Sequence, residues 1–336
     1  MWEKYSPLED KIYRVMDDEG KLIDSSYKPK LKAKEIVSAY DSMVFARLAD
    51  QMAVSYQRQG RMYTYPPNFG QEAIATAAGM VLRKEDWLVI AFREMNAWLQ
   101  KGAKLRDIFM YFGGYEDGAL FSGAPNITPS SVPIASQLLH AVGIGYSIKL
   151  RKEKKVVIAF VGDGGTSQGD FHEALNFAAV WNVPVVFIIQ NNQFAISVPV
   201  KQQTVSRNLA VKSIAYGMPG IKVDGNDLFA MYDTVSEAVA HAMAGNGPSL
   251  IEGLTFRRGA HTTSDDPSLY RTEAEEKEWA EKDPLKRLKN YLLDREMIDA
   301  SKEEAQLDGY REEIEREFTA FENHPAYKLE DVFQYN

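Results

Sequence analysis

The chain has 336 residues, of which 45% are hydrophobic and 26% are charged, a composition typical of a soluble globular protein with one large α/β domain or two ordinary ones. It contains no cysteine, which excludes disulfides, cysteine-ligated zinc, iron–sulfur clusters and thiol nucleophiles. The 39 Lys and Arg residues against 47 Asp and Glu residues give a net charge of −8, which disfavours nucleic acid or an anionic membrane as a partner. Residues 1–5 show no basic stretch followed by an apolar one, so we expect no signal peptide and a cytoplasmic protein.

The N-terminal part of the chain is predicted to be mainly helical. Apolar residues at helical spacing predict a helix over 31–59, and a second helix, rich in small residues, is expected over 71–80. Prolines and a glycine mark 63–70 as the loop between them. A short strand is predicted over 87–92 and a further helix over 135–150.

The centre of the chain predicts a mostly parallel α/β sheet. Residues 156–161 and 183–189 are continuous apolar runs without alternation, as expected of strands that are covered on both faces. A helix near 170–181 connects them, so the three elements form a βαβ unit whose strands end at the same edge of the sheet. The pattern continues with a strand, a helix and a strand, predicted over 220–225, 228–244 and 249–256.

One segment of this region, 174–200, has no charged residue over 27 positions, which is long enough to cross a bilayer. Its asparagines, glutamines and proline argue against a membrane span because they would leave polar groups in hydrocarbon. A helix followed by a buried strand accounts for the same residues. We therefore expect no membrane association.

Polar residues follow both central strands. The segment 162–165, with Asp163 among three glycines, comes directly after the first strand, and 191–194, with Asn192, comes after the second. Because parallel strands end at one edge, these segments should lie side by side. Carboxylate and amide oxygens are ligands that magnesium prefers, and glycines let backbone N–H groups approach an anion. A Gly-Asp-Gly sequence alone could be only a turn, but the two segments together favour a site for a diphosphate with its divalent metal.

The two segments carry a resemblance: Gly162-Asp163-Gly164, followed after 26 residues by Asn191-Asn192, resembles the thiamine diphosphate motif. Over 65–270 the chain resembles the alpha subunit of the decarboxylating component of 2-oxo acid dehydrogenase complexes. The other matching segments are 70–73, 92–94, 165–170, 194–197, 223–225 and 261–266, and the C-terminal helices, including 282–288, are similar too.

This resemblance implies a thiamine diphosphate-binding fold and names its ligands. Asp163, Asn192 and the main-chain carbonyl of Phe194 would bind magnesium. The diphosphate would be held by Arg93 and the amides of Gly164 and Gly165.

The resemblance also assigns residues around the organic part of the cofactor. Val132 and Ile134 match positions whose backbone meets the aminopyrimidine, and Ile134 would be the apolar wedge that bends the cofactor. Phe92, also expected at the cofactor, replaces a tyrosine often found there. Gln190 stands where some relatives have an arginine or a glutamate.

His261 matches a histidine that reaches the diphosphate and the reacting carbon from a mobile loop, and it is the expected catalytic residue. The following segment, 262–272, aligns with one that is phosphorylated in some relatives. The alternative for 262–272 is an active-site loop that becomes ordered when the cofactor binds.

A neighbouring loop resembles the potassium-binding loop of the branched-chain enzyme's alpha subunit. The matching residues are Ser131, Pro133, Ser136 and Gln137. The alternative, an ordinary turn that faces the cofactor, stays open.

The domain division that we predict is a helical N-terminal arm over 1–62, one doubly wound α/β domain over 63–271 that binds the diphosphate half of the cofactor, and a helical C-terminal extension over 272–336. In the family, the glutamate that activates the cofactor belongs to a beta subunit, and 336 residues leave no room for that domain. The resemblance therefore implies a heterotetramer of two alpha and two beta subunits that acts with a lipoyl-bearing acyltransferase component.

The implied reaction is oxidative decarboxylation of a 2-oxo acid with transfer of the acyl group to lipoyl. The matches at 131–137 and 223–229 favour branched-chain 2-oxo acids, and pyruvate dehydrogenase and acetoin dehydrogenase are the alternatives. From another class of function, a non-catalytic subunit that binds diphosphate and serves assembly also stays open.

Overall fold

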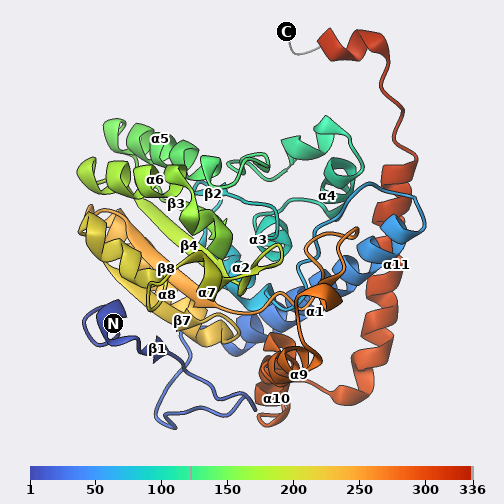
Figure 1. The fold of residues 1–336 in the computed structure, drawn as a ribbon. Helices are drawn as coiled ribbons and strands as arrows, with labels where there is room; N and C mark the ends of the chain where they lie inside the picture. The colour runs from blue at the N-terminus through green and yellow to red at the C-terminus, as the bar shows by residue number, and fades with distance from the viewer. Residues whose placement is uncertain (122, 334–336) are drawn as a thin grey trace.

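The protein is described from a computed structural model, over residues 1–121 and 123–333, and it is built around one parallel sheet (Figure 1). The sheet has six strands in the order β1-β7-β8-β4-β3-β2, and every neighbouring pair is parallel. This confirms the predicted fold class. The strands are β1 (Ile12–Tyr13), β2 (Trp87–Val89), β3 (Val157–Gly162), β4 (Val185–Asn191), β7 (Gly220–Asp224) and β8 (Ser249–Leu254), with a separate antiparallel pair, β5 (Phe194–Ala195) and β6 (Val198–Pro199).

Helices cover both faces of this sheet. On one face, α5 and α6 pack against Phe187 and the other strand residues whose side chains point to that side. On the other face, α1, α2 and α8 pack against Ile188 and the strand residues that point the same way as Ile188. Both faces are buried, which is why the central strands are apolar at every position. The helices are α1 (Ala33–Arg58), α2 (Glu72–Val81), α3 (Met95–Gln100), α4 (Leu105–Phe112), α5 (Ser136–Leu150), α6 (Gly169–Val180), α7 (Val200–Gln203), α8 (Leu228–Met243), α9 (Glu273–Glu281), α10 (Pro284–Leu293) and α11 (Glu303–Glu322).

Two strands are shorter than predicted. β2 ends at Val89 rather than at residue 92, because the backbone turns there and Glu94 accepts hydrogen bonds from the N–H groups of Ala91 and Arg93. β8 ends at Leu254 rather than at residue 256. In both cases the chain leaves the sheet where residues of the cavity begin.

The two central strands are paired so that their ends coincide. β3 and β4 run in register from Val157 opposite Val185 to Gly162 opposite Gln190. Asp163 therefore begins a short 3-10 helix, Asp163–Ser167, beside the last residue of β4. This register places the two predicted polar segments at one edge of the sheet.

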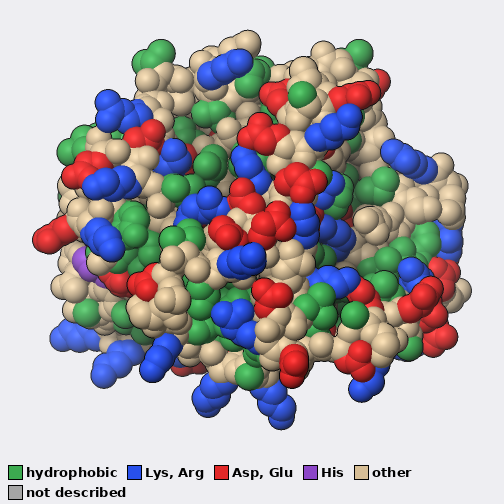
Figure 2. All heavy atoms as spheres, turned by 90° about the horizontal axis from the view of Figure 1, so that it is seen from below, with side chains coloured by type: hydrophobic (Ala, Val, Ile, Leu, Met, Phe, Trp, Pro, Cys, Tyr) green, Lys and Arg blue, Asp and Glu red, His purple; other side chains and the backbone are tan. Residues whose placement is uncertain are grey.

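The N-terminal part of the chain contributes β1 to the sheet and then forms α1, and the C-terminal part forms α9, α10 and α11. α1 and α11 pack together, and the rings of Tyr56 and Phe318 stack at 3.6 Å. The division into 1–62, 63–271 and 272–336 stays a prediction, and residues 122 and 334–336 lie outside the described residues. Within the described ranges, no helix is both long enough and apolar enough to span a bilayer. Figure 2 shows acidic and basic side chains interspersed over the centre of one face, with mostly basic side chains along its lower edge.

Candidate active site

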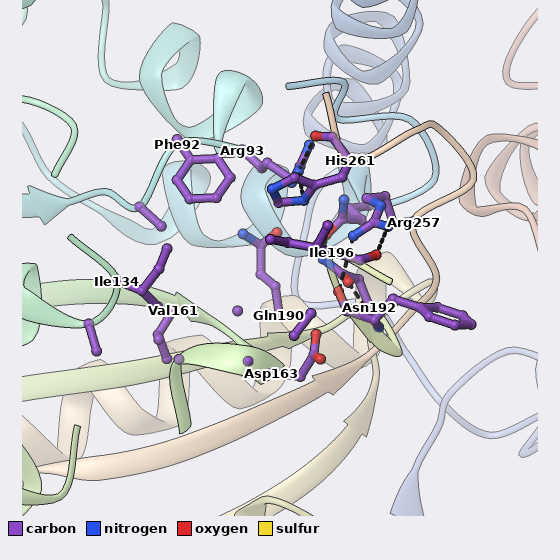
Figure 3. A pocket seen from close by; sticks show the side chains of 18 of the residues that line it. Phe92, Arg93, Ile134, Val161, Asp163, Gln190, Asn192, Ile196, Arg257 and His261 are labelled. Atoms are coloured by element: carbon purple, nitrogen blue, oxygen red, sulfur yellow. Dashed lines mark hydrogen bonds between the residues drawn. The ribbon is translucent and has the colours of Figure 1, made fainter. Parts of the chain in front are cut away.

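A cavity of about 230 Å³ opens at the edge of the sheet where β3 and β4 end (Figure 3). Its wall is contributed by the turn after β2, the loop before α5, the ends of β3 and β4, and the segment after β8. The residues predicted for the site that line it are Phe92, Arg93, Ser131, Ile134, Gln137, Asp163, Gly164, Gly165, Asn192, Phe194 and His261. The fold thus brings together residues that are almost 170 positions apart in the chain.

The predicted magnesium ligands lie together at this edge. Asn192 Oδ1 lies 3.2 Å from Asp163 Oδ1 and 3.2 Å from the carbonyl oxygen of Phe194. Acceptor oxygens this close repel one another, and a divalent cation between them removes the repulsion. The opposite orientation of the Asn192 amide would instead direct its N–H groups at both oxygens. The donor set therefore fits magnesium.

Charge points to the same conclusion. Burial raises the pKa of Asp163 to about 6, so its ionised form is disfavoured until a cation compensates it. Among the described residues, no group of three or more His, Cys, Asp or Glu side chains could hold a metal ion. A metal at this edge would therefore depend on amide, carbonyl and cofactor oxygens in addition to one carboxylate.

The two glycines that follow Asp163 are required by close packing. A Cβ atom at Gly164 would lie 2.5 Å from Ala195 Cβ, and one at Gly165 would lie 2.3 Å from a methyl group of Val161. Either side chain would push the 3-10 helix away from the strand ends. The glycines thus hold the backbone N–H groups of this turn close to the cavity.

Two buried arginines line the cavity. Arg93 donates to the Pro67 carbonyl at 2.7 Å and Arg257 donates to the Phe194 carbonyl at 3.0 Å, and no ion pair of either arginine is found in the described part of the chain. Burial, followed by the positive charge of Arg257, lowers the pKa of Arg93 to about 9. Arg93 stays cationic near neutral pH, so an anion in the cavity would relieve its repulsion from Arg257.

His261 lies beside Arg93 at the mouth of this cationic region (Figure 3). Its Nδ1 lies 2.9 Å from Arg93 Nη2, which also donates to the His261 carbonyl at 2.5 Å. Burial, then the charges of Arg93 and Arg257, lower the pKa of His261 to about 4. The ring is therefore neutral near pH 7, and because an arginine only donates, the ring proton is on Nε2.

The loop that carries His261 is held by a carboxylate. Asp265 accepts hydrogen bonds from the His261 N–H at 2.7 Å and from the Tyr270 hydroxyl at 2.5 Å, and Tyr270 in turn accepts from Arg257 at 3.0 Å. These contacts tie His261 and Tyr270, the two ends of the segment 261–270, to Asp265 and to Arg257, and His261 lines the cavity. Its phosphorylation and its ordering by the cofactor both stay predictions.

The residues predicted for the organic part of the cofactor are placed differently from one another. Ile134 lines the cavity and is 44% exposed, as a side chain that awaits a partner would be. Phe92 also lines the cavity, with its ring edge-on to His261 at 6.5 Å. Val132 is 74% exposed and lies outside the cavity lining, so the predicted role of its backbone stays a prediction.

The predicted potassium loop is a compact turn. Ser136 Oγ lies 2.7 Å from Ser131 Oγ and donates to the Pro133 carbonyl at 2.7 Å. Gln137 is buried and donates to the Phe160 carbonyl, while its Oε1 has no hydrogen-bond partner within the described ranges. The unpaired oxygen supports a cation site, and the bonds within the loop support an ordinary turn.

A buried Glu94–Gln190 pair at the back of the cavity was not predicted. Glu94 is fully buried, accepts the N–H groups of Ala91 and Arg93 at 3.0 Å each, and accepts from Gln190 Nε2 at 2.5 Å. The pair therefore fixes the turn that carries Arg93. The sequence shows a glutamate directly after the predicted Arg93, but it does not show the hydrogen-bond partner of that glutamate, which lies 96 residues away.

The Glu94 carboxyl should make the stability of the protein depend on pH. Burial raises the pKa of Glu94 to about 7, so the folded chain keeps a proton that the unfolded chain, with a pKa of about 4.3, releases earlier. The resulting stabilisation is present below the unfolded pKa and is lost as the pH rises through the folded one. Relative to wild type, Glu94→Gln should gain about 2 to 3 kcal/mol between about pH 5 and about pH 8 in denaturant titrations. If the free energy of unfolding had the same pH dependence in both proteins, the raised pKa of Glu94 would be contradicted.

Known proteins are similar to this chain over most of its length. The sequence profile described as "Dehydrogenase E1 component" matches residues 40–330. The "Pyruvate dehydrogenase E1 component subunit alpha" of Mycoplasma genitalium is 39% identical over 325 residues, covering 97% of this chain and 91% of the relative. The protein of the same name from Acholeplasma laidlawii is 46% identical, covering 83% and 81%. The "3-methyl-2-oxobutanoate dehydrogenase subunit alpha" of Mycobacterium tuberculosis (strain CDC 1551 / Oshkosh) is 44% identical, covering 87% and 77%. The chain therefore belongs to the dehydrogenase E1 component family, and within it to the alpha-subunit type that its strand-end motifs resemble.

Proposed function

We propose that this chain is the alpha subunit of a thiamine diphosphate- and magnesium-dependent 2-oxo acid dehydrogenase that transfers an acyl group to lipoyl. The observation that carries the proposal is the convergence of three oxygens, from Asp163, Asn192 and Phe194, beside two arginines without ion-pair partners among the described residues. An oxygen site for a divalent cation next to a cationic wall suits a diphosphate with its metal.

The residues of this chain divide the work of binding. Asp163, Asn192 and the Phe194 carbonyl hold magnesium, while Arg93 and the amides of Gly164 and Gly165 hold the diphosphate. When bound, thiamine diphosphate supplies the electron sink for decarboxylation of the 2-oxo acid.

His261 is the proposed catalytic residue, and it also binds the cofactor. Its neutral ring accepts from Arg93 at Nδ1 and presents the N–H of Nε2, so it can stabilise developing negative charge or move a proton at that atom. Ile134 packs against the organic part of the cofactor, and Phe92 and the backbone of Val132 complete that wall. The loop with Ser131, Pro133, Ser136 and Gln137 is the proposed potassium site.

The active site is completed by partners. We propose a beta subunit, which supplies the acid that activates the cofactor, in an assembly of two alpha and two beta subunits in the cytoplasm, and a lipoyl-bearing acyltransferase component that accepts the acyl group. The cysteine-free chain fits this division, because the sulfur chemistry would belong to lipoyl.

For the substrate, we propose a branched-chain 2-oxo acid on the match of the loop 131–137. Pyruvate is supported by the extent of the similarity to the subunits named for pyruvate dehydrogenase, which reaches 97% of this chain. Acetoin dehydrogenase is the third possibility, and a non-catalytic assembly subunit is the alternative from another class. Discrimination between small apolar substituents involves only about 1 to 3 kcal/mol per methylene, so it must be measured.

The test is reconstitution of the chain with a beta subunit, thiamine diphosphate and magnesium. Turnover of 3-methyl-2-oxobutanoate, pyruvate and acetoin is compared with a dye as electron acceptor. We expect turnover of one of the two oxo acids that requires both chains, and none when the alpha chain carries Asp163→Ala. An assembled pair that binds the cofactor but consumes none of the three would favour the assembly subunit.

A further inference from the structure

Each side-chain ligand of the proposed metal site has a second polar atom, and a glutamine holds it. Asp163 Oδ2 accepts from Gln203 Nε2 at 3.0 Å, and Asn192 Nδ2 donates to Gln71 Oε1 at 3.0 Å. Gln71 directly precedes α2 and comes before both ligands in the chain. Gln203 is the last residue of α7 and comes after both ligands.

The orientation of the Asn192 amide is coupled to that of Gln71. An amide group has two ends of similar shape, and in the turned orientation the Asn192 nitrogen would lie 3.2 Å from both Asp163 Oδ1 and the Phe194 carbonyl. It would then donate to both, so Asn192 would offer no oxygen to a cation. Gln71 would have to turn as well, so that its nitrogen donates to Asn192; with Gln71 Oε1 facing Nδ2, as here, Asn192 Oδ1 faces the metal position.

Gln71 is itself suited to this task. It is 1% exposed and lines the cavity, and its Nε2 has no hydrogen-bond partner in the part of the chain that the structure describes. An unpaired buried N–H group costs about 1 to 3 kcal/mol, and turning both amides would pair it with Asn192. A cation needs Asn192 Oδ1, so a bound metal favours the orientation in which Gln71 accepts.

The Gln203 contact performs the corresponding task for Asp163. Gln203 Nε2 also donates to the Val198 carbonyl at 2.9 Å, which anchors the glutamine to β6. The carboxylate is therefore held by Oδ2 and presents Oδ1 toward Asn192. Gln203 lies outside the cavity lining, so it acts on the cavity through Asp163.

We propose that Gln71 and Gln203 are positioning residues for the metal ligands: each binds the atom that must face away from the cation, so that Asn192 Oδ1 and Asp163 Oδ1 converge on it. The loss of a residue that hydrogen-bonds to a metal ligand typically lowers metal affinity about 10- to 100-fold. The inference rests on the proposed function, since it presupposes that Asp163 and Asn192 bind a metal.

The test measures metal affinity rather than turnover. The full chain, assembled with the beta subunit and saturated with thiamine diphosphate, is titrated with Mn²⁺, which is followed by its electron paramagnetic resonance. We expect Gln71→Leu and Gln203→Leu each to raise the Kd for Mn²⁺ by about 10- to 100-fold. Gln71→Glu, which can only accept from Asn192 once ionised, should keep the Kd within about threefold of wild type. Gln202→Leu, at an exposed position of the same short helix, is the matched control and should bind as wild type does.

The outcomes separate the inference from the proposed function. If wild type fails to bind Mn²⁺ with the cofactor, or binds it equally well with Asp163→Ala, the metal site itself is wrong. If wild type binds and both leucine variants bind as tightly, the positioning role is wrong and the metal site stands. Should Gln71→Leu fail to fold, as its burial makes conceivable, the partly exposed Gln203 carries the test. A loss of cofactor binding that high Mn²⁺ concentrations do not restore would indicate a general structural role and overturn the inference.

Discussion

Replacing Asp163 by alanine is expected to abolish the metal-dependent binding of thiamine diphosphate. Asp163 is the sole carboxylate among the proposed ligands, and without it this chain would offer the cation only an amide and a carbonyl oxygen. We expect the affinity for the cofactor in the presence of magnesium to fall by more than about 100-fold, the upper range for groups that only support a ligand. Isothermal titration calorimetry with and without magnesium measures the change.

A matched control separates this effect from a general change of charge. Glu173 is an exposed carboxylate on α6, ten residues further along the chain, and Glu173→Ala removes the same charge away from the cavity. It should leave cofactor binding unchanged. The fold without cofactor should tolerate Asp163→Ala, because burial already disfavours the charged form of this carboxyl. Full cofactor affinity in Asp163→Ala would refute the metal assignment.

Replacing His261 by alanine is expected to reduce turnover much more than cofactor binding. The ring accepts from Arg93 and keeps its proton on Nε2, which is the atom proposed to act during catalysis. General acid or base groups typically contribute about 10²- to 10⁴-fold, so kcat should fall within this range. Steady-state turnover by the assembled enzyme and calorimetric cofactor titration give the two quantities separately.

Part of the loss in His261→Ala would come from Arg93, which loses a side-chain partner. His261→Gln is the control, because a glutamine oxygen can accept from Arg93 while the side chain cannot take part in proton transfer near neutral pH. This variant should bind the cofactor nearly as wild type does and remain slow. If it recovers both binding and turnover, His261 serves only to position Arg93, and its catalytic role must be given up.

The central pair of the site could be predicted from the sequence because local rules carry over to three dimensions. Two uninterrupted apolar runs joined by a helix predict adjacent parallel strands, and the residues directly after them must share an edge. Asp163 and Asn192 are those residues, and the register with Gly162 opposite Gln190 brings them together. The expected lengths of β2 and β8 were less accurate, because side-chain and loop hydrogen bonds end those strands early.

What the sequence by itself determined is therefore the fold class, the family resemblance and the residues whose position follows from the ends of two consecutive strands. Only the tertiary structure decided the supporting contacts: Gln71 and Gln203 against the two ligands, Gln190 against Glu94, and Arg257 beside the metal position. The physical reason is the same for each. A hydrogen bond forms only when donor and acceptor are placed to within a few tenths of an ångström, and these side chains lie up to 121 residues apart in the chain. No periodicity or spacing along the chain encodes such a placement.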